Sequence, residues 1–164
     1  MCVIRETACL FRCAGRAGVS WRKGMFAMLI SALIHDIGHP GTNNDYEVKT
    51  NSKLAQRYKD SGAGVLECHH VDFALDLLLS AEFDVFHRWS GELRQKLREV
   101  VRDALLATDM ALRKAQTEEL QRRALLPSPF DLSLVEERVA YSQLLLHAAD
   151  IFNAARPFHV CRAR

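Results

Sequence analysis

Histidine and aspartate side chains that suit a metal ion stand together in one short stretch of the chain. His35 and Asp36 directly follow an apolar segment, and His39 comes four residues after His35. Imidazole nitrogens and carboxylate oxygens are ligands of divalent transition metals, and a carboxylate can bridge two of them. If a helix continued that far, His35 and His39 would share one face. An isolated His-Asp pair is more simply a hydrogen-bonded helix end, so this pair alone does not decide the question.

Three further clusters of polar residues occur in otherwise apolar segments. His147 and Asp150 are three residues apart on an apolar segment, so both point the same way if it is helical. A carboxylate in such a place is costly to bury unless it is paired or binds a metal. Glu67–His70 and Leu106–Met110 place further polar groups at or inside helical patterns. Helices that each deliver an acid from an apolar face favour a metal site between them.

The elements that must position these residues are predicted to be helices. Apolar residues recur at helical spacing in five segments, and no alternating pattern is long enough to predict a sheet. Clusters of glycine and proline, and Ser61–Gly64, interrupt the helices. The predicted fold is therefore all-α, with six or so helices in a single domain. The predicted helices are residues 25–35, a shorter helix capped by Asn43 and Asn44, a helix around 71–79, one begun by Ser90, and 131–151.

Composition and charge exclude several classes of protein. Hydrophobic residues make up 49% and charged residues 26% of the 164 residues, which is typical of a globular domain. A net charge of +2 is too small to indicate polymeric nucleic acid as a partner. No apolar stretch approaches the ~20 residues of a transmembrane helix. Five cysteines without a C-x-x-C pair favour a reduced protein, so a cytoplasmic (intracellular) location is expected, with membrane association left open.

The stretch from His35 to Tyr46 resembles the signature of class I 3′,5′-cyclic-nucleotide phosphodiesterases. His35, Asp36 and His39 are followed by Gly41 and Asn44 at the family's fixed steps. Four further blocks resemble the family in the same order, and several matching blocks make chance unlikely. These blocks are Thr50–Ala55, Val65–His70, Leu106–Met110 and Leu146–Ile151. The resemblance covers residues 21–158, predicted as a partial catalytic domain of the helical metal-dependent phosphohydrolase (HD) type; residues 1–20 and the tail 159–164 stay unassigned.

The resemblance implies two divalent metals, zinc and magnesium (or manganese). His35, Asp36 and Asp150 would be ligands of the tightly held zinc, and Asp36 would also bridge to the second metal. The catalytic residues His39, Glu67 and Thr108 would hold waters of that second metal.

The resemblance also implies the reaction and the substrate contacts. The 3′ phosphoester bond of cAMP or cGMP would be hydrolysed to a nucleoside 5′-monophosphate, in signal transduction. Asp36, Met110 and Asn153 would contact the substrate, while Asn44 and His70 would brace the loop.

The chain also departs from the family. No histidine precedes His35, so the family's proton donor and a fourth metal ligand are missing, and the purine-orienting glutamine and stacking aromatic residue are missing after the last block. A domain truncated at both ends is therefore predicted, with possible self-association through exposed apolar faces. Two alternatives stay open. The chain could be a non-catalytic fragment or pseudoenzyme that binds metal, or a generic HD-type phosphohydrolase.

Overall fold

The computed structural model describes residues 19–151 except 81 and 85, and these residues form helices, turns and loops without a strand. The all-α prediction is thus confirmed. The chain divides into two compact units: a central unit, Ile34–Arg113, and a flanking unit made of Met1–Leu33 and Lys114–Arg164. The predicted domain limits at residues 21 and 158 stay predictions. No helix in the described part of the chain has the length and apolar character that crossing a membrane requires.

Helix α2 (Val19–Ile34) leads directly to the His-Asp pair. Its buried residues Ala27, Met28 and Ala32 are 2–3% exposed, as its apolar sequence predicts. The helix ends at Ile34, so His35 and His39 do not share a helix face. It cannot continue because Gly38 adopts a φ of +70°, in the left-handed region, before the helix-breaking Pro40.

The short helix predicted after Asn43 is in fact two helices, α3 (Asn44–Lys49) and α4 (Lys53–Tyr58). The chain breaks between them at Asn51, whose φ is +49°, a conformation that asparagine tolerates better than most residues. Asn43 caps α3 by accepting the Tyr46 amide at 2.8 Å. Asn44 does not act as the cap. It is the first residue of α3.

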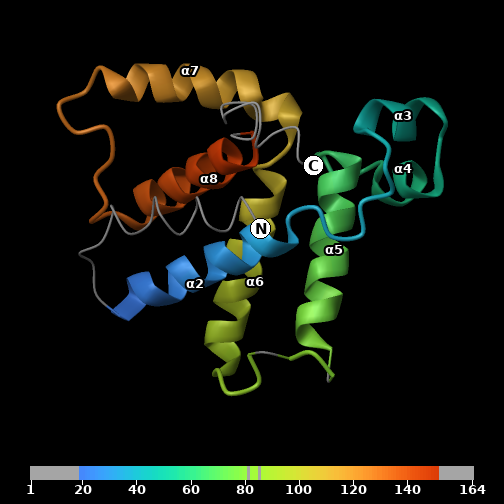
Figure 1. Ribbon diagram of the computed structural model, residues 1–164, viewed down its shortest axis with the longest axis horizontal. Coiled ribbons are helices and arrows are strands. Elements are labelled where there is room, and N and C mark those ends of the chain that lie inside the picture. Colours follow the sequence, from blue (N-terminus) through green and yellow to red (C-terminus); the bar gives the residue numbers. More distant parts are fainter. Residues whose placement is uncertain (1–18, 81, 85, 152–164) are drawn as a thin grey trace, which may run out of the picture. The chain divides into compact units, whose positions relative to one another are not determined.

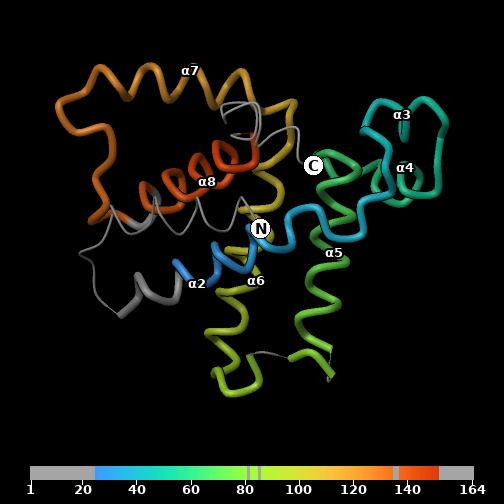
Figure 2. Tube along the Cα trace, in the orientation of Figure 1, coloured from blue at the N-terminus to red at the C-terminus, as the bar shows by residue number. Residues whose placement is uncertain are grey.

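Two long helices, α5 (Val65–Leu79) and α6 (Gly91–Leu106), lie side by side and form the core of the central unit (Figures 1 and 2). Both follow the predicted apolar stripes, and Ser90 caps α6 as predicted. Helices α3 and α4 pack against α5. The residues that close this core are Ala74, Leu78, Phe86, Leu97, Val101, Ala104 and Leu105, each at most 8% exposed.

Beyond the core, the 3-10 helix η1 (Met110–Leu112) leads to α7 (Arg113–Ala124), and α8 (Val135–Ile151) follows. Helix α8 begins four residues later than predicted. Helix α7 is predominantly polar and lacks the apolar stripe that reveals a helix in sequence, so the sequence gives it no bounds. In the flanking unit, Arg123 of α7 pairs with Glu137 of α8 and lies over the Phe130 ring at 4.7 Å.

Candidate metal centre

The His-Asp pair occupies the turn that follows α2. His35 Nε2 and Asp36 Oδ2 are 3.4 Å apart, and their side chains are 12% and 65% exposed. The Asp36 carboxylate can therefore meet a solvent-borne ion or substrate, whereas His35 is largely enclosed.

Two histidines of α5 hold the backbone of this turn. His70 Nδ1 lies 2.9 Å from the Ile37 carbonyl oxygen, and His69 Nε2 lies 3.0 Å from the Gly38 carbonyl oxygen. A carbonyl oxygen can only accept, so the ring nitrogen facing it carries the hydrogen. In neutral His70 the proton is therefore on Nδ1, and Nε2 presents a lone pair.

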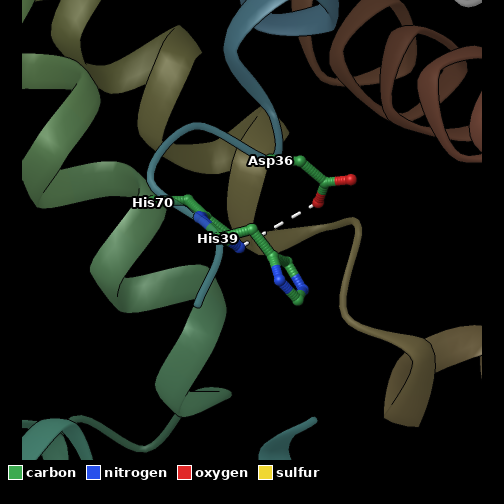
Figure 3. A group of neighbouring side chains, drawn as sticks. All are labelled: Asp36, His39 and His70. Atoms are coloured by element: carbon green, nitrogen blue, oxygen red, sulfur yellow. Dashed lines mark ion pairs between the residues drawn. The ribbon is translucent and has the colours of Figure 1, made fainter. Parts of the chain in front are cut away.

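That lone pair faces Asp36. His70 Nε2 and Asp36 Oδ1 are 4.0 Å apart, and both side chains point toward the same space (Figure 3). The His39 ring stacks on the His70 ring, with centroids 5.4 Å apart and planes inclined by 22°. One potential ligand atom from each of these three residues lies within 4.8 Å of the others. A carboxylate and an imidazole lone pair facing one another fit a divalent cation or a water that bridges them.

His39 is suited to donating a hydrogen bond within this cluster. The Gly41 amide donates to His39 Nδ1 at 2.9 Å, so Nδ1 is unprotonated. Neutral His39 must then carry its proton on Nε2. A protonated nitrogen cannot ligate a metal, but it can donate to a water or a phosphoryl oxygen. The tautomer thus favours water-holding over direct ligation.

Burial supports the neutral form of His70. The side chain is 3% exposed. Burial lowers the pKa of His70, against smaller raising effects of the Ile37 carbonyl and the Asp36 carboxylate. The imidazole is therefore neutral near pH 7, as a metal ligand or a hydrogen-bond acceptor must be.

A second polar group forms at the amino terminus of α5. Asn44 donates to Glu67 Oε2 at 2.9 Å and accepts the Leu66 amide at 2.8 Å, which ties α3 to α5. Side chains converge on Gly64: an added Cβ would lie 2.0 Å from Glu67 Oε2 and 2.8 Å from Asp109 Oδ2. The sequence indicates polar residues at Glu67 and Asp109, but it does not indicate that both carboxylates approach the position that a side chain at Gly64 would occupy.

Thr108 lies just beyond the end of α6. Its hydroxyl donates to the Leu105 carbonyl oxygen at 2.7 Å. The hydrogen is thereby committed, and the hydroxyl oxygen keeps its lone pairs to accept a hydrogen bond from a water.

Glu47 is a polar residue that the sequence did not single out. It is 4% exposed and accepts hydrogen bonds from the hydroxyls of Thr42 and Ser52, so it ties the loop after His39 to both α3 and α4. These two hydroxyls lower the pKa of the Glu47 carboxyl. A single acid in a short, polar helix resembles a solvent-exposed residue in sequence, and no pattern distinguishes it.

The remaining predicted site residues belong to other elements of the chain. His147, 6% exposed, and the partly buried Asp150 lie near the end of α8 in the flanking unit. Met110 begins η1 and is 51% exposed. Asn153 lies outside the described residues. The assignment of Asp150 as a third ligand beside His35 and Asp36 stays a prediction.

A comparison of the sequence with known protein families identifies the family of this chain. The family described as 3′5′-cyclic nucleotide phosphodiesterase matches residues 1–164, the full length of the chain. The chain belongs to this family. The match includes residues 1–20 and 159–164, which the sequence blocks left unassigned.

Individual phosphodiesterases show the same relationship. The chain is 35% identical over 136 residues to the 3′,5′-cyclic-nucleotide phosphodiesterase regA of Dictyostelium discoideum, covering 83% of this chain and 17% of that protein. It is 34% identical over 143 residues to the mouse 3′,5′-cyclic-AMP phosphodiesterase 4C, covering 84% of this chain and 21% of that protein. The chain thus spans about a fifth of the length of these curated phosphodiesterases.

A solved phosphodiesterase has the same fold. The phosphodiesterase domain of the RhoPDE fusion protein from the choanoflagellate Salpingoeca rosetta is 29% identical, with a TM-score of 0.82. The similarity covers 98% of this chain and 50% of that domain. The fold is accordingly that of all-α, HD-type phosphohydrolases. Membership of the phosphodiesterase family implies dependence on divalent metal. The cluster of Asp36, His39 and His70 supplies groups that suit a divalent metal site.

Proposed function

We propose that this chain contributes the metal-binding part of an enzyme that hydrolyses the 3′ phosphoester bond of cyclic nucleotides to nucleoside 5′-monophosphates. The observation that carries the proposal is the convergence of Asp36, His39 and His70 in a chain that matches the phosphodiesterase family throughout. The relatives regA and phosphodiesterase 4C are named for the hydrolysis of cyclic nucleotides and of cyclic AMP, respectively.

We propose two divalent metals, zinc and magnesium (or manganese). His35, Asp36 and Asp150 would hold the first, and Asp36 would bridge to the second. Such ions lower the pKa of water and offset the charge on phosphoryl oxygens. The proposal is supported by the exposed Asp36 carboxylate and by the imidazole lone pair of His70 that faces it.

The chain's own groups have distinct tasks in this scheme. His39 Nε2–H would donate to a water or to a phosphoryl oxygen, since Gly41 occupies Nδ1. His70 Nε2 would accept a hydrogen from a bound water. Thr108 Oγ1 and the Glu67 carboxylate would accept from further waters and orient them. These tasks position the water whose oxygen bonds to phosphorus as the bond from phosphorus to O3′ breaks.

We propose Asp36, Met110 and Asn153 as substrate contacts. The Met110 side chain is exposed and available to an apolar face of a ligand. We also propose self-association as a property of the chain, since Leu33, Val48 and Leu125 are apolar side chains with 61–86% exposure.

A metal-binding protein without turnover is the second candidate. It is favoured by one observation: residues 1–34 contain no histidine, so none of them could protonate the leaving O3′ oxygen as an imidazolium. Loss of a general acid typically lowers the rate by ~10²–10⁴-fold. The generic HD-type phosphohydrolase is disfavoured by the match of the whole chain to one family.

Hydrolysis after controlled removal of metal distinguishes these candidates. The purified chain would be stripped with a chelator and assayed with cAMP, cGMP and bis(4-nitrophenyl) phosphate, before and after Zn²⁺ and Mg²⁺ are restored. The proposal predicts metal-dependent turnover of at least one cyclic nucleotide. Turnover of the nitrophenyl ester alone would support the generic phosphohydrolase, and metal binding without any turnover would support the pseudoenzyme.

A further inference from the structure

Two neighbouring side chains of α5 contact two successive peptide groups of the metal-site turn. His70 bonds to the Ile37 carbonyl oxygen, and His69 bonds to the Gly38 carbonyl oxygen through Nε2 at 3.0 Å. His70 also faces Asp36 and belongs to the site itself. Among the described residues, His69 makes no hydrogen bond or ion pair with Asp36, His39 or His70, although its ring centroid lies 5.8 Å from that of His70. The proposed reaction gives it no task.

The backbone that His69 contacts is that of a glycine. Gly38 lies between the two carbonyl groups and has a φ of +70°. Glycine has the largest conformational freedom of any residue, so its own preference does not hold these peptide groups in place. The backbone bond from the His39 amide closes the turn, and contacts from α5 hold its two carbonyl groups. The Gly38 Cα is enclosed by α5, because a Cβ added there would lie 3.2 Å from the Phe73 ring and 3.3 Å from His69 Nε2.

We infer that His69 is a positioning residue that fixes His39 relative to Asp36 through the Gly38 peptide group. The Gly38 carbonyl belongs to the peptide bond that leads into His39. Its hydrogen bond to His69 therefore sets the direction in which the chain enters His39. The His39 amide in turn lies 3.2 Å from the Asp36 carbonyl oxygen, which closes the turn. This inference rests on the proposed function in that Asp36 and His39 are the groups being positioned.

A purely structural role is the competing explanation. The His69 ring also packs edge-on against Phe73, with centroids 6.0 Å apart and planes at 67°. If packing were its only role, the ring would matter and the Nε2 hydrogen would not.

Three variants separate the hydrogen bond from the packing. In His69→Gln, the glutamine Nε2 is separated from Cα by the same number of bonds as the histidine Nε2. The side-chain amide of glutamine can therefore reach the Gly38 carbonyl oxygen. In His69→Asn the amide nitrogen takes the place of Nδ1 and falls short. His69→Leu keeps apolar bulk without a donor. Glutamine and asparagine have the same chemistry, so this pair is the matched comparison.

Two quantities are measured on the purified full chain. The first is the affinity for Mn²⁺, obtained from the paramagnetic resonance signal of the free ion. The second is the rate of hydrogen exchange of the His39 amide in the absence of metal. We expect His69→Asn and His69→Leu to bind Mn²⁺ about fivefold more weakly and to exchange the His39 amide about fivefold faster, the effect of one lost hydrogen bond. His69→Gln is expected to stay within about twofold of wild type in both.

The inference is overturned if His69→Gln is as impaired as His69→Leu, or if His69→Asn behaves as wild type. Circular dichroism confirms folding, and the Gln and Asn pair decides even if the leucine variant does not fold. If the wild-type chain binds no Mn²⁺, the proposed function fails instead. The exchange of the His39 amide still tests His69 in that case, because it requires no metal.

Discussion

Hydrogen bonds with backbone carbonyl and amide groups determine what the individual imidazoles of this site can do. The Ile37 carbonyl leaves Nε2 of His70 as an acceptor, whereas the Gly41 amide leaves Nε2 of His39 as a donor. Two stacked histidines thus offer opposite hydrogen-bonding groups to the space beside Asp36. Residue types and spacing predict which histidines gather at a metal, but they do not predict this division, because it depends on the direction of single peptide groups.

Tyr58 gives a residue-level prediction for high pH. Its hydroxyl donates to Asp72 at 2.8 Å, and burial together with this carboxylate raises the pKa of Tyr58 to about 12. The folded-state pKa of Tyr58 lies above its unfolded value of about 10, so the protonated hydroxyl contributes its full stabilisation of the fold below pH 10. That stabilisation is lost as pH rises through 12. Urea unfolding should therefore show the free energy of unfolding of wild type falling more steeply from pH 10 to 12 than that of Tyr58→Phe. Equal slopes would contradict the assignment.

Glycine conformations give the prediction at the scale of elements. Gly38 and Gly62 have nearly the same φ, +70° and +71°, but only Gly38 packs against other atoms. Gly62→Ala should cost only the left-handed penalty, roughly 1–2 kcal/mol in free energy of unfolding. Gly38→Ala should cost more, since its Cβ would press on the Phe73 ring, and it should also weaken Mn²⁺ binding.

Urea unfolding and a Mn²⁺ titration of both alanine variants measure this difference. Gly62→Ala serves as the control, because its loop joins α4 to α5 and an added Cβ meets nothing within 4 Å. Identical losses of stability, with Mn²⁺ affinity unchanged in both, would show that the Gly38 turn does not depend on its contact with α5.

The elements differ in how well their sequences reveal them. Helices α5 and α6 carry apolar stripes and were predicted, as was the Ser90 cap. The division of α3 from α4 was not predicted, since it depends on the positive φ of Asn51, which lacks the glycine or proline signal of most breaks. The bounds of helix α7 could not be predicted, because it has no buried residue to create periodicity. Helices with a buried face can be predicted from the periodicity of their apolar residues, whereas helices without a buried face lack that periodicity.

At the scale of the whole molecule, the core of the central unit positions the site. Leu105 is fully buried on α6, and Leu112 in η1 of the same unit is 45% exposed. Leu105→Ala should lower the free energy of unfolding by about 2–5 kcal/mol, because it removes apolar contacts and leaves a cavity. Leu112→Ala, the same substitution at an exposed position, should cost less than about 1 kcal/mol. Urea unfolding measures both, and similar costs would contradict the described core.

Family and fold could be predicted from the chain, but the full site could not. The block from His35 to Tyr46 identified the family, and the family match confirms that membership. The ligand role of Asp150, the metal identities and the intracellular location stay predictions. Glu47 and the hydrogen bond from His69 to the Gly38 carbonyl escaped prediction because burial and carbonyl direction arise only when distant segments pack.

The measurement that tests the central claim most directly is the product formed from cAMP by wild type, Asp36→Asn and Asp45→Asn, with Zn²⁺ and Mg²⁺ present. Asp45 is the matched control, an exposed acid nearby in the sequence whose carboxylate forms an ion pair with Lys49. The account predicts 5′-AMP from wild type and Asp45→Asn, and a loss of more than about 100-fold in Asp36→Asn. Equal turnover by wild type and Asp36→Asn, or release of the 3′-monophosphate, would contradict it.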